Sequence, residues 1–370
     1  PLAVSPAPQT TEGSELTDRL VILAADVDEA PRGLRIVRLG DAPAGVPPKP
    51  DTAALALIAA LLLGLTGCPG PDGSAGTASR TVTVYCAHDR IHAEAVLKRF
   101  ERETGITVRA KWDTEAAKTT GLVNTLIAEA GMPRCDVFWN NEVSQSAVLA
   151  ERGLAAPYTS PKAQDIPAQY KDADGRWTGF AARSRVFIVN TELVPEDQRP
   201  RRLEDLFEPK WRGKVGFARP LFGTTATHAA ALFQARGEEG GRAFFQRLKT
   251  AGVVICAGNA RVKDRVAAGE LAWGVTDTDD FNIARLAGKP VVAVFPDQGK
   301  DGAGTLVIPN SVVLIKGAPH AEEARALIDF LLDPSVEAEL AKGRAAQIPL
   351  RPSVERPDWI PAELKAMTVD

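Results

Sequence analysis

The sequence of 370 residues lacks the features that mark several functional classes. Its formal net charge at pH 7 is −3 and no domain-wide basic excess is present, so we expect no nucleic acid partner. It has no Cys-x-x-Cys pair, which argues against a structural zinc site. It also lacks a Gly-x-Ser-x-Gly elbow, a His-Glu-x-x-His motif and a Gly-Lys-Ser/Thr phosphate loop. We therefore expect a protein that is not an enzyme, and we keep a metal-dependent hydrolase as the alternative from another class.

Long hydrophobic runs are also scarce. The only one covers residues 53–65, which is shorter than the roughly 20 residues that a membrane-spanning helix needs. Because Leu65-Thr66-Gly67-Cys68 follows at once, the run resembles a bacterial lipoprotein signal. The resemblance implies that residues 48–67 are a signal peptide and that Cys68 carries lipid, with residues 68–79 as a flexible tether. A buried helix is the alternative for the apolar run.

Residues 1–47 do not fit such a precursor. The stretch is rich in proline and does not begin with Met. We expect a non-native or disordered leader that an over-extended reading frame has added, with the real start near Val46.

Cysteines are few. If Cys68 carries lipid, Cys86, Cys135 and Cys256 remain. An odd number in an exported protein leaves at least one free thiol unless a bond forms between molecules. The pairing of the three stays open.

From Thr81 onward the hydrophobic pattern alternates between strand and helix. Strands are expected at 81–85, 106–110 and 135–139, with helices at 91–104 and 120–130 between and after them. This order predicts an α/β fold whose parallel sheet has helices on both faces. Ligands of such sheets bind at the carboxyl ends of the strands.

The first candidate binding residues follow two of these strands. His88 comes after the first strand, and Asn141 and Glu142 come after the third. All three are polar and lie where a ligand is expected. The alternatives are an ordinary loop histidine for His88 and, for Glu142, a first-turn residue that complements a helix dipole.

The stretch Gly223-Thr224-Thr225 joins a strand at 214–218 to an alanine-rich helix. Free backbone N–H groups, the helix dipole and short hydroxyls at this place can together hold a phosphate, phosphonate or carboxylate group. The alternative is that Thr224 or Thr225 is only an N-cap.

Charged residues mark the remaining candidates. Arg183 and Arg185 flank Ser184 inside an apolar strand, and because burying an unpaired charge is costly, at least one should face a cleft or a carboxylate. Asn259 follows another strand, at 253–256. Asp277-Thr278-Asp279-Asp280 follows the strand at 271–276, and adjacent carboxylates repel one another unless a cation is near. A solvated turn that caps the next helix is the alternative.

Several segments together carry a family resemblance. They are Val82–Tyr85, Asp136–Trp139, Trp177–Asn190, Asp205-Leu206 with 209–216, Gly269–Ala272, and Ala318-Pro319-His320 with the helix that runs to Leu332, Pro334 and Glu337. Residues from about 80 to 355 resemble the extracellular solute-binding proteins of ABC importers, in particular the ferric-ion-binding-protein-like group and related binders of phosphorylated compounds.

The resemblance implies a two-lobed periplasmic-binding-protein fold (type II), with the lobes joined by crossing hinge strands near 182–185 and 304–309. Lobe 1 would comprise residues 80–182 and 309–370, and lobe 2 residues 183–308. The lobes would close over a small ligand, so residues from both must touch it. The expected ligand residues are His88, Asn141, Glu142, Arg183, Gly223, Thr224, Thr225, Asn259, Asp279 and Asp280.

The identity of the ligand is left open by a departure from the family pattern. Members that hold ferric iron directly use two consecutive tyrosines where this sequence has Asp279-Asp280. A ferric site would here rely on His88, Glu142, Asp279 and Asp280, with a synergistic anion. The alternative is a small anion or zwitterion such as an aminoalkylphosphonate or phosphate ester, with its anionic group on Gly223–Thr225, helped by Arg183 or Arg219, and its amine on the carboxylates.

The same resemblance implies the partners. We expect a periplasmic or extracytoplasmic monomer that needs no cofactor, is held at the membrane by lipid only, and delivers its ligand to ABC permease subunits. A purely structural surface lipoprotein is a further alternative.

Overall fold

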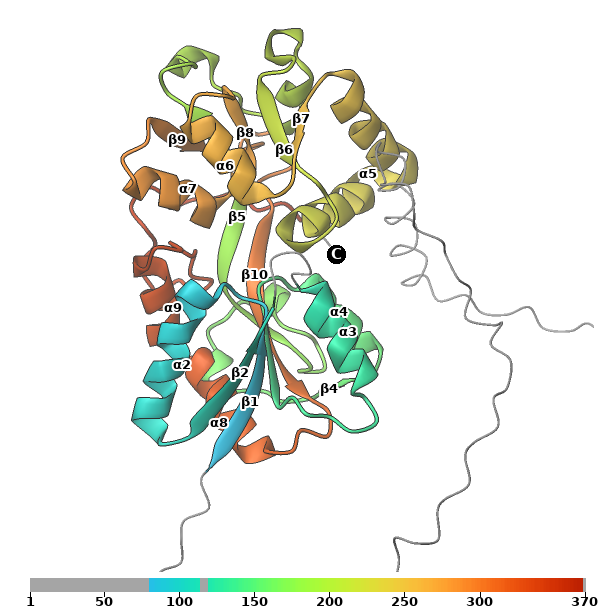
Figure 1. The fold of residues 1–370 in the computed structure, drawn as a ribbon, viewed down its shortest axis with the longest axis vertical. Helices are drawn as coiled ribbons and strands as arrows, with labels where there is room; N and C mark the ends of the chain where they lie inside the picture. Colours follow the sequence, from blue (N-terminus) through green and yellow to red (C-terminus); the bar gives the residue numbers. More distant parts are fainter. Residues whose placement is uncertain (1–79, 114–118, 369–370) are drawn as a thin grey trace, which may run out of the picture. The chain divides into compact units, whose positions relative to one another are not determined.

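The computed structural model describes residues 80–113 and 119–368. The expected leader, signal peptide, tether and Cys68 lie outside them. Within the described part, no helix is long and apolar enough to span a bilayer. Strands and helices alternate along the chain in a mixed α/β fold, as the sequence predicts (Figure 1).

The first group of strands is parallel. β1 (Thr81–Cys86) pairs in parallel with β2 (Thr107–Trp112) on one side and with β3 (Val137–Asn140) on the other. Valines alternate along β1, and both of its faces are almost fully buried, as is usual for a central parallel strand. Its helices are α2 (Arg90–Thr104), α3 (Thr120–Ala128), α4 (Ser144–Glu151), α8 (Ala321–Leu331) and α9 (Pro334–Lys342). The strands and helices expected here are confirmed to within a few residues.

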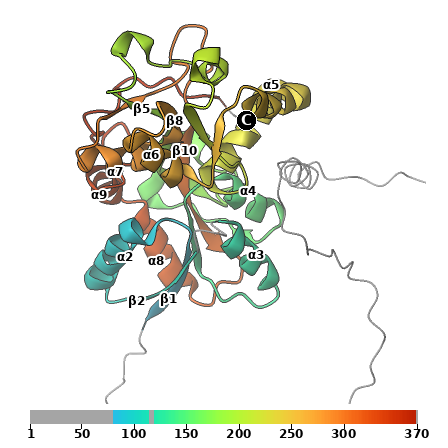
Figure 2. The same cartoon turned by 45° about the horizontal axis from the view of Figure 1, so that its top comes forward.

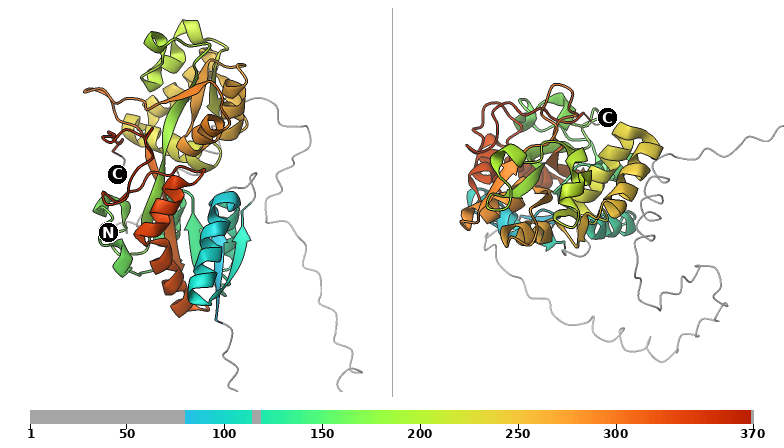
Figure 3. Two further views of the ribbon diagram at one scale, coloured as in Figure 1. Left: turned by 90° about the vertical axis from the view of Figure 1, so that its left-hand side faces the viewer. Right: turned by 90° about the horizontal axis from the view of Figure 1, so that it is seen from above.

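Two long strands connect this group to a second one. β10 (Val307–Ile315) runs antiparallel to β3 and to the first half of β5 (Thr178–Asn190). β5 pairs with β10 as far as Ser184, and from Arg185 onward it pairs with β8 (Trp273–Asp277). The views in Figures 1 and 3 agree that β5 and β10 lie side by side between the two groups.

The second group contains the remaining long elements. β6 (Val215–Ala218) pairs in parallel with β7 (Val254–Cys256) and with β8, and β9 (Val291–Val294) pairs with β5. Its helices are α5 (Gly223–Thr250), α6 (Asn259–Ala267) and α7 (Thr278–Leu286) (Figure 2). The short elements of the described chain are β4 (Ala155–Ala156) and the 3₁₀ turns Pro161–Ala163, Ala168–Tyr170, Glu196–Gln198, Leu203–Phe207 and Pro209–Trp211.

Each group has its own hydrophobic core. In the first, Trp139 and Leu327 are fully buried in a cluster between the sheet and its helices. In the second, Phe187 and Trp273 pack with their ring centroids 4.8 Å apart in a separate cluster. Since each group buries its own apolar side chains, the two need few hydrophobic contacts with each other beyond β5 and β10.

The segment after Leu350 returns to the second group. Lys365 N–H donates to Gln298 Oε1 at 2.9 Å, and the Trp359 ring lies 4.9 Å from that of Phe281. The expected division instead assigns all of 309–370 to the first lobe. The lobe boundaries therefore remain a prediction. The contacts of the segment after Leu350 differ from the predicted assignment of that segment to lobe 1.

The helical patterns at 229–233 and 240–251 predict two separate helices. α5 spans both but breaks at Gly237, whose φ of 70° is left-handed, so its two segments correspond to the two predicted helices. Asp279 and Asp280 lie inside the first turn of α7 and not in a turn before it. The three cysteines in the described part, Cys86, Cys135 and Cys256, are all free and buried.

Candidate functional site

Arg183 joins the two groups of elements at the centre of the site. Its Nη1 lies 3.2 Å from Asp279 Oδ2, at the start of α7, and its Nη2 lies 3.2 Å from Nδ1 of His88, which follows β1. All three side chains are buried, and the His88 ring stacks on Trp139 with 5.4 Å between centroids. The expectation that an arginine of this strand meets a carboxylate is confirmed.

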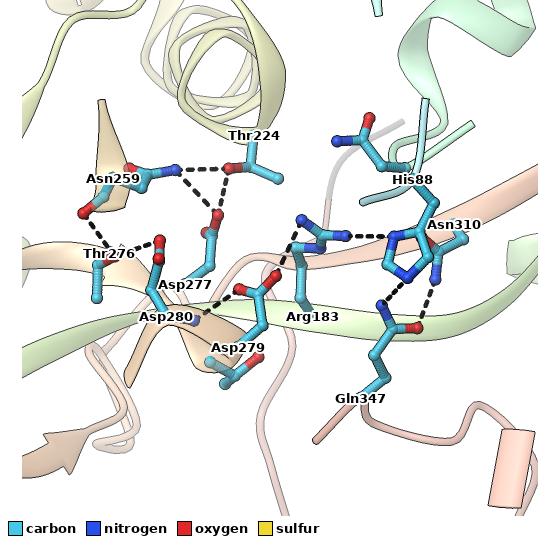
Figure 4. A network of polar contacts seen from close by, with 12 residues as sticks. His88, Arg183, Thr224, Asn259, Thr276, Asp277, Asp279, Asp280, Asn310 and Gln347 are labelled. Carbon is cyan, nitrogen blue, oxygen red and sulfur yellow. Dashed lines mark hydrogen bonds and ion pairs between the residues drawn. The ribbon is translucent and has the colours of Figure 1, made fainter. Parts of the chain in front are cut away.

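The contacts of His88 continue into the C-terminal part of the chain (Figure 4). Its Nε2 lies 3.3 Å from Gln347 Nε2, and Gln347 Oε1 accepts a hydrogen bond from Asn310 at 2.7 Å. Gln347 and Asn310 are fully buried. Sequence analysis missed both, because nothing in the local pattern links residue 347 with residue 88.

Arg185 forms a second buried ion pair, with Asp277. Its Nη1 lies 2.5 Å from Asp277 Oδ1, and it also lies 3.3 Å from the Thr224 hydroxyl. Thr224 donates to Asp277 Oδ2 at 2.5 Å, and Asn259 Nδ2 lies 2.9 Å from that same oxygen. Thr225 donates to Asn259 Oδ1 at 3.0 Å. The predicted residues Thr224, Thr225 and Asn259 thus meet around Asp277, which had not been placed among the ligand residues.

The N-terminus of α5 has no cap. Phe222 stands at the N-cap position and offers no side-chain acceptor, and no described residue accepts from the backbone N–H groups of Gly223, Thr224 or Thr225. Thr224 and Thr225 are nonetheless buried. A buried helix start with free N–H groups is a favourable place for an anion.

The buried guanidinium groups also have unused hydrogen-bond donors. Nε and Nη2 of Arg185 and Nε of Arg183 have no partner in the described part of the chain. Buried polar groups are normally satisfied, and each exception needs a reason such as an absent ligand or water. Because Arg185 Nη1 lies 3.3 Å from the Thr224 hydroxyl, the unused N–H groups of Arg185 add to the donors at the start of α5.

Glu142 and Asn141 have other partners. Glu142 precedes the N-cap residue Val143 of α4 and accepts from Ser144 N at 2.7 Å and from Gln145 N at 3.1 Å, so its carboxylate lies at the N-terminus of α4 but outside its first turn. Thr227 of α5 also donates to Glu142 at 3.2 Å, which links the two groups. Asn141 accepts from Thr119 at 2.8 Å. Neither residue contacts His88 or Asp279 through a hydrogen bond in the described part of the structure.

The carboxylates at the end of β8 and the start of α7 form the only group of three or more side chains among the described residues that could hold a metal ion. Oxygen atoms of Asp277, Asp279 and Asp280 lie within 4.8 Å of one another. Burial, followed by the charges of Asp279 and Asp277, raises the pKa of Asp280 to about 8. Burial also raises the pKa of Asp279, although Arg183 opposes this effect. Asp280 is therefore mostly protonated at pH 7.

This arrangement does not suit a ferric ion. Arg183 stands between His88 and Asp279, Arg185 neutralises Asp277, and Glu142 accepts from the first N–H groups of α4. The four residues expected to hold iron are thus not assembled around one point. A cation at Asp280 would instead have to displace a proton or replace an arginine.

Comparisons with known proteins agree with this architecture. The family model described as "bacterial extracellular solute-binding protein" matches residues 136–370. The chain belongs to this family. The resemblance seen in the sequence, to solute-binding proteins of ABC importers in the ferric-binding-like group, is thereby confirmed.

Relatives within this family have different ligands in their names. The Fe(3+)-binding periplasmic protein of Serratia marcescens is 30% identical over 54% of this chain, and the match spans 58% of that protein, less than two thirds of its length. The putative 2-aminoethylphosphonate-binding periplasmic protein of Salmonella typhimurium is 28% identical over 75% of this chain and 82% of its own length.

A solved structure confirms the fold. Iron-bound HitA of Pseudomonas aeruginosa has a TM-score of 0.68 and 24% identity, covering 76% of this chain and 90% of that one. This likeness supports the type II periplasmic-binding-protein fold predicted from the sequence. The chain is a solute-binding protein of the ABC importer type.

Proposed function

We propose that this protein captures a small anion or zwitterion, such as a phosphonate or phosphate ester, and delivers it to an ABC permease. The observation that carries the proposal is the uncapped, buried start of α5 beside the unused N–H groups of Arg185. A phosphonate or phosphate group accepts several hydrogen bonds at once and carries the negative charge that a helix N-terminus and a guanidinium both favour. The relative named for 2-aminoethylphosphonate supports this choice.

The carboxylates give the proposal its zwitterionic form. Asp277 already pairs with Arg185, and Asp279 with Arg183, so Asp280 is the carboxyl group without an arginine partner within 4 Å. An ammonium group near Asp280 would lower its raised pKa and release a proton to the solvent. Calorimetric titration in buffers of different ionisation enthalpy measures this proton release.

Ligand capture would involve both groups of elements. The contact of Arg183 with His88 and that of Thr227 with Glu142 cross between them. Because a ligand shifts a conformational equilibrium only through contacts that differ between the states, these crossing contacts are the ones that hinge closure would make or break. Outside the described residues, we keep the proposal that Cys68 carries a lipid anchor and that the protein is extracytoplasmic and monomeric.

Ferric iron with a synergistic anion is the second candidate. The iron-binding name of the Serratia relative favours it, and the three clustered carboxylates offer the hard oxygen ligands that ferric iron prefers. Arg183 and Arg185 count against it, because a trivalent cation would have to displace both from their carboxylates.

Thermal unfolding against a panel of compounds distinguishes the two candidates. The panel holds ferric citrate, inorganic phosphate, a phosphate ester and an aminoalkylphosphonate, because a ligand that binds only the folded state raises the transition temperature. We expect a metal-free phosphorus compound to raise it and Arg185→Lys to reduce the shift. A shift by ferric citrate alone, reversed by a chelator, would show that iron is the cargo. A compound that is converted to product would instead favour the hydrolase.

A further inference from the structure

A groove of about 360 Å³ lies beside α7. It is lined by Asn282, Arg285 and Leu286 of α7, by residues 341–344 and Ala346 at the end of α9 and just after it, and by the C-terminal segment 355–359. Its volume is in the range of small-molecule sites. Nothing in the proposed cargo site uses it.

The groove is strongly basic for a protein of net charge −3. Four of its lining residues are cations, Arg285, Lys342, Arg344 and Arg356, against two carboxylates, Glu355 and Asp358. In the described part of the chain, none of the four cations has a carboxylate oxygen within 4 Å, although ion pairs are frequent elsewhere on the surface. Four unpaired cations around one hollow attract anions more strongly than any one of them does alone.

Local contacts hold the side chains of Arg285 and Arg356 and the backbone of Arg344 in place. Arg285 Nε donates to Asn282 Oδ1 at 3.0 Å, and its guanidinium carbon lies 5.8 Å from the centre of the Trp359 ring. Asn282 Nδ2 in turn donates to the backbone carbonyl of Arg344 at 2.8 Å. Arg356 Nη1 donates to the carbonyl of Ala362 at 3.0 Å. A site whose donors are already oriented loses less entropy when it binds.

The groove adjoins the candidate cargo site. Asp279, which pairs with Arg183, precedes Asn282 by one turn of α7. Gln347, which contacts His88, follows Arg344 by three residues. The groove therefore joins α7 of the second group to the end of α9 in the first.

We propose that this groove is a second binding site, for a small multivalent anion that carries phosphate or carboxylate groups. The bound anion bridges α7 and the segment after α9, and it strengthens capture of the cargo by holding these elements together. The proposal that an anion binds here depends only on the groove. The proposed effect of that anion on cargo capture rests on the proposed function.

Direct titration tests the site without any cargo. Citrate and pyrophosphate are titrated into the protein at constant ionic strength, with acetate as the monovalent comparison, and heat and tryptophan fluorescence are recorded. We expect saturable binding that weakens at least tenfold in the double variant Arg285→Glu, Arg344→Glu. Arg185→Lys, which alters the cargo site only, should keep it.

A matched control removes the effect of net charge. The double variant Arg102→Glu, Arg109→Glu reverses two exposed cations on α2 and β2, and Arg102 lies in the last turn of α2 as Arg285 does in α7. If the groove cations only complement helix dipoles, the protein shows no saturable anion binding, and the proposal is overturned. Equal loss in both double variants, or loss in Arg185→Lys with retention in the groove variant, also overturns it.

The coupling is tested separately. With a cargo compound from the thermal panel, citrate or pyrophosphate should raise the affinity for that compound at least threefold in the unmodified protein and not in the groove variant. Groove binding without any change in cargo affinity would refute the coupling. If no panel compound binds at all, the proposed function fails, while the direct titration still decides the groove.

Discussion

Buried arginines occur in two regions of this protein, and their surroundings differ. Arg351 is 1% exposed and all of its nitrogens have partners: Nε meets Asp165 at 2.7 Å, Nη1 meets Glu337 at 3.1 Å, and Nη2 meets the carbonyls of Lys162 and Leu332, each at 2.5 Å. Arg185 is equally buried, yet it uses only Nη1.

The difference separates an arginine whose donors are all used within the protein from one whose donors are available to a ligand. Arg351 lies where the chain leaves the first group of elements. Its partner Glu337 also accepts hydrogen bonds from Ala181 N at 2.7 Å and Leu350 N at 3.1 Å. In this closed network of Arg351, Glu337 and their partners, no guanidinium N–H group remains free to bind a ligand. The unused donors of Arg185, beside the uncapped start of α5, are consistent with the proposed anion site.

The largest effect on stability is expected at the closed network. Arg351→Ala leaves Glu337 buried without its cation, which should lower the free energy of unfolding by about 3–5 kcal/mol. Chemical denaturation measures this loss. The exposed control Arg152→Ala should stay within about 0.5 kcal/mol of the parent. If Arg351→Ala abolished ligand binding while the fold remained stable, the division between the two regions would be wrong.

Substitution of Arg185, whose network with Asp277 and Thr224 leaves donors unused, should change cargo affinity more than stability. Arg185→Lys keeps the charge beside Asp277 but removes the planar fork of donors, so we expect cargo affinity to fall by about 10- to 100-fold with little change in stability. Isothermal titration and denaturation of the same sample give both quantities. A variant that loses stability and keeps its affinity would class Arg185 with Arg351.

The dependence of stability on pH sharpens the comparison further. The folded-state pKa of Asp280 is raised to about 8, mainly by burial, from its ordinary value of 3.8. The folded protein therefore binds this proton more tightly than the unfolded chain. The stability that this proton contributes to the folded state is lost as pH rises from about 4 to about 8. Asp280→Asn should flatten that part of the stability curve, whereas the exposed Asp301→Asn should leave it unchanged. If the dependence of stability on pH were unaltered in Asp280→Asn, a group other than Asp280 would be responsible for it.

The smallest effect is expected at the threonines. Thr225→Val removes one hydrogen bond to Asn259, which should cost about 1 kcal/mol of stability. Because the backbone N–H groups of α5 remain, cargo affinity should change only a few-fold. A loss of affinity as large as that of Arg185→Lys would show that the hydroxyl, and not the helix start, holds the anion.

Local sequence patterns determined much of the fold. Apolar alternation in 81–85 and helical spacing in 91–104 correspond to β1 and α2, because these periods follow from backbone geometry alone. The start of α5 was also predicted from local sequence, because Gly223 and the threonines follow a strand. The break at Gly237 lies between the helical patterns at 229–233 and 240–251, which the sequence keeps apart.

The partners within the site were decided only by tertiary structure. The sequence by itself placed His88, Thr224, Asn259 and Asp279 at strand and helix ends, and Arg183 within a strand. Arg185 meets Asp277 because antiparallel pairing of β5 with β8 sets these two residues opposite each other. A shift of one residue in that register would turn the side chains to opposite faces of the sheet, and no local pattern specifies the pairing. Likewise, Gln347 reaches His88 only after the chain has passed through both groups of elements.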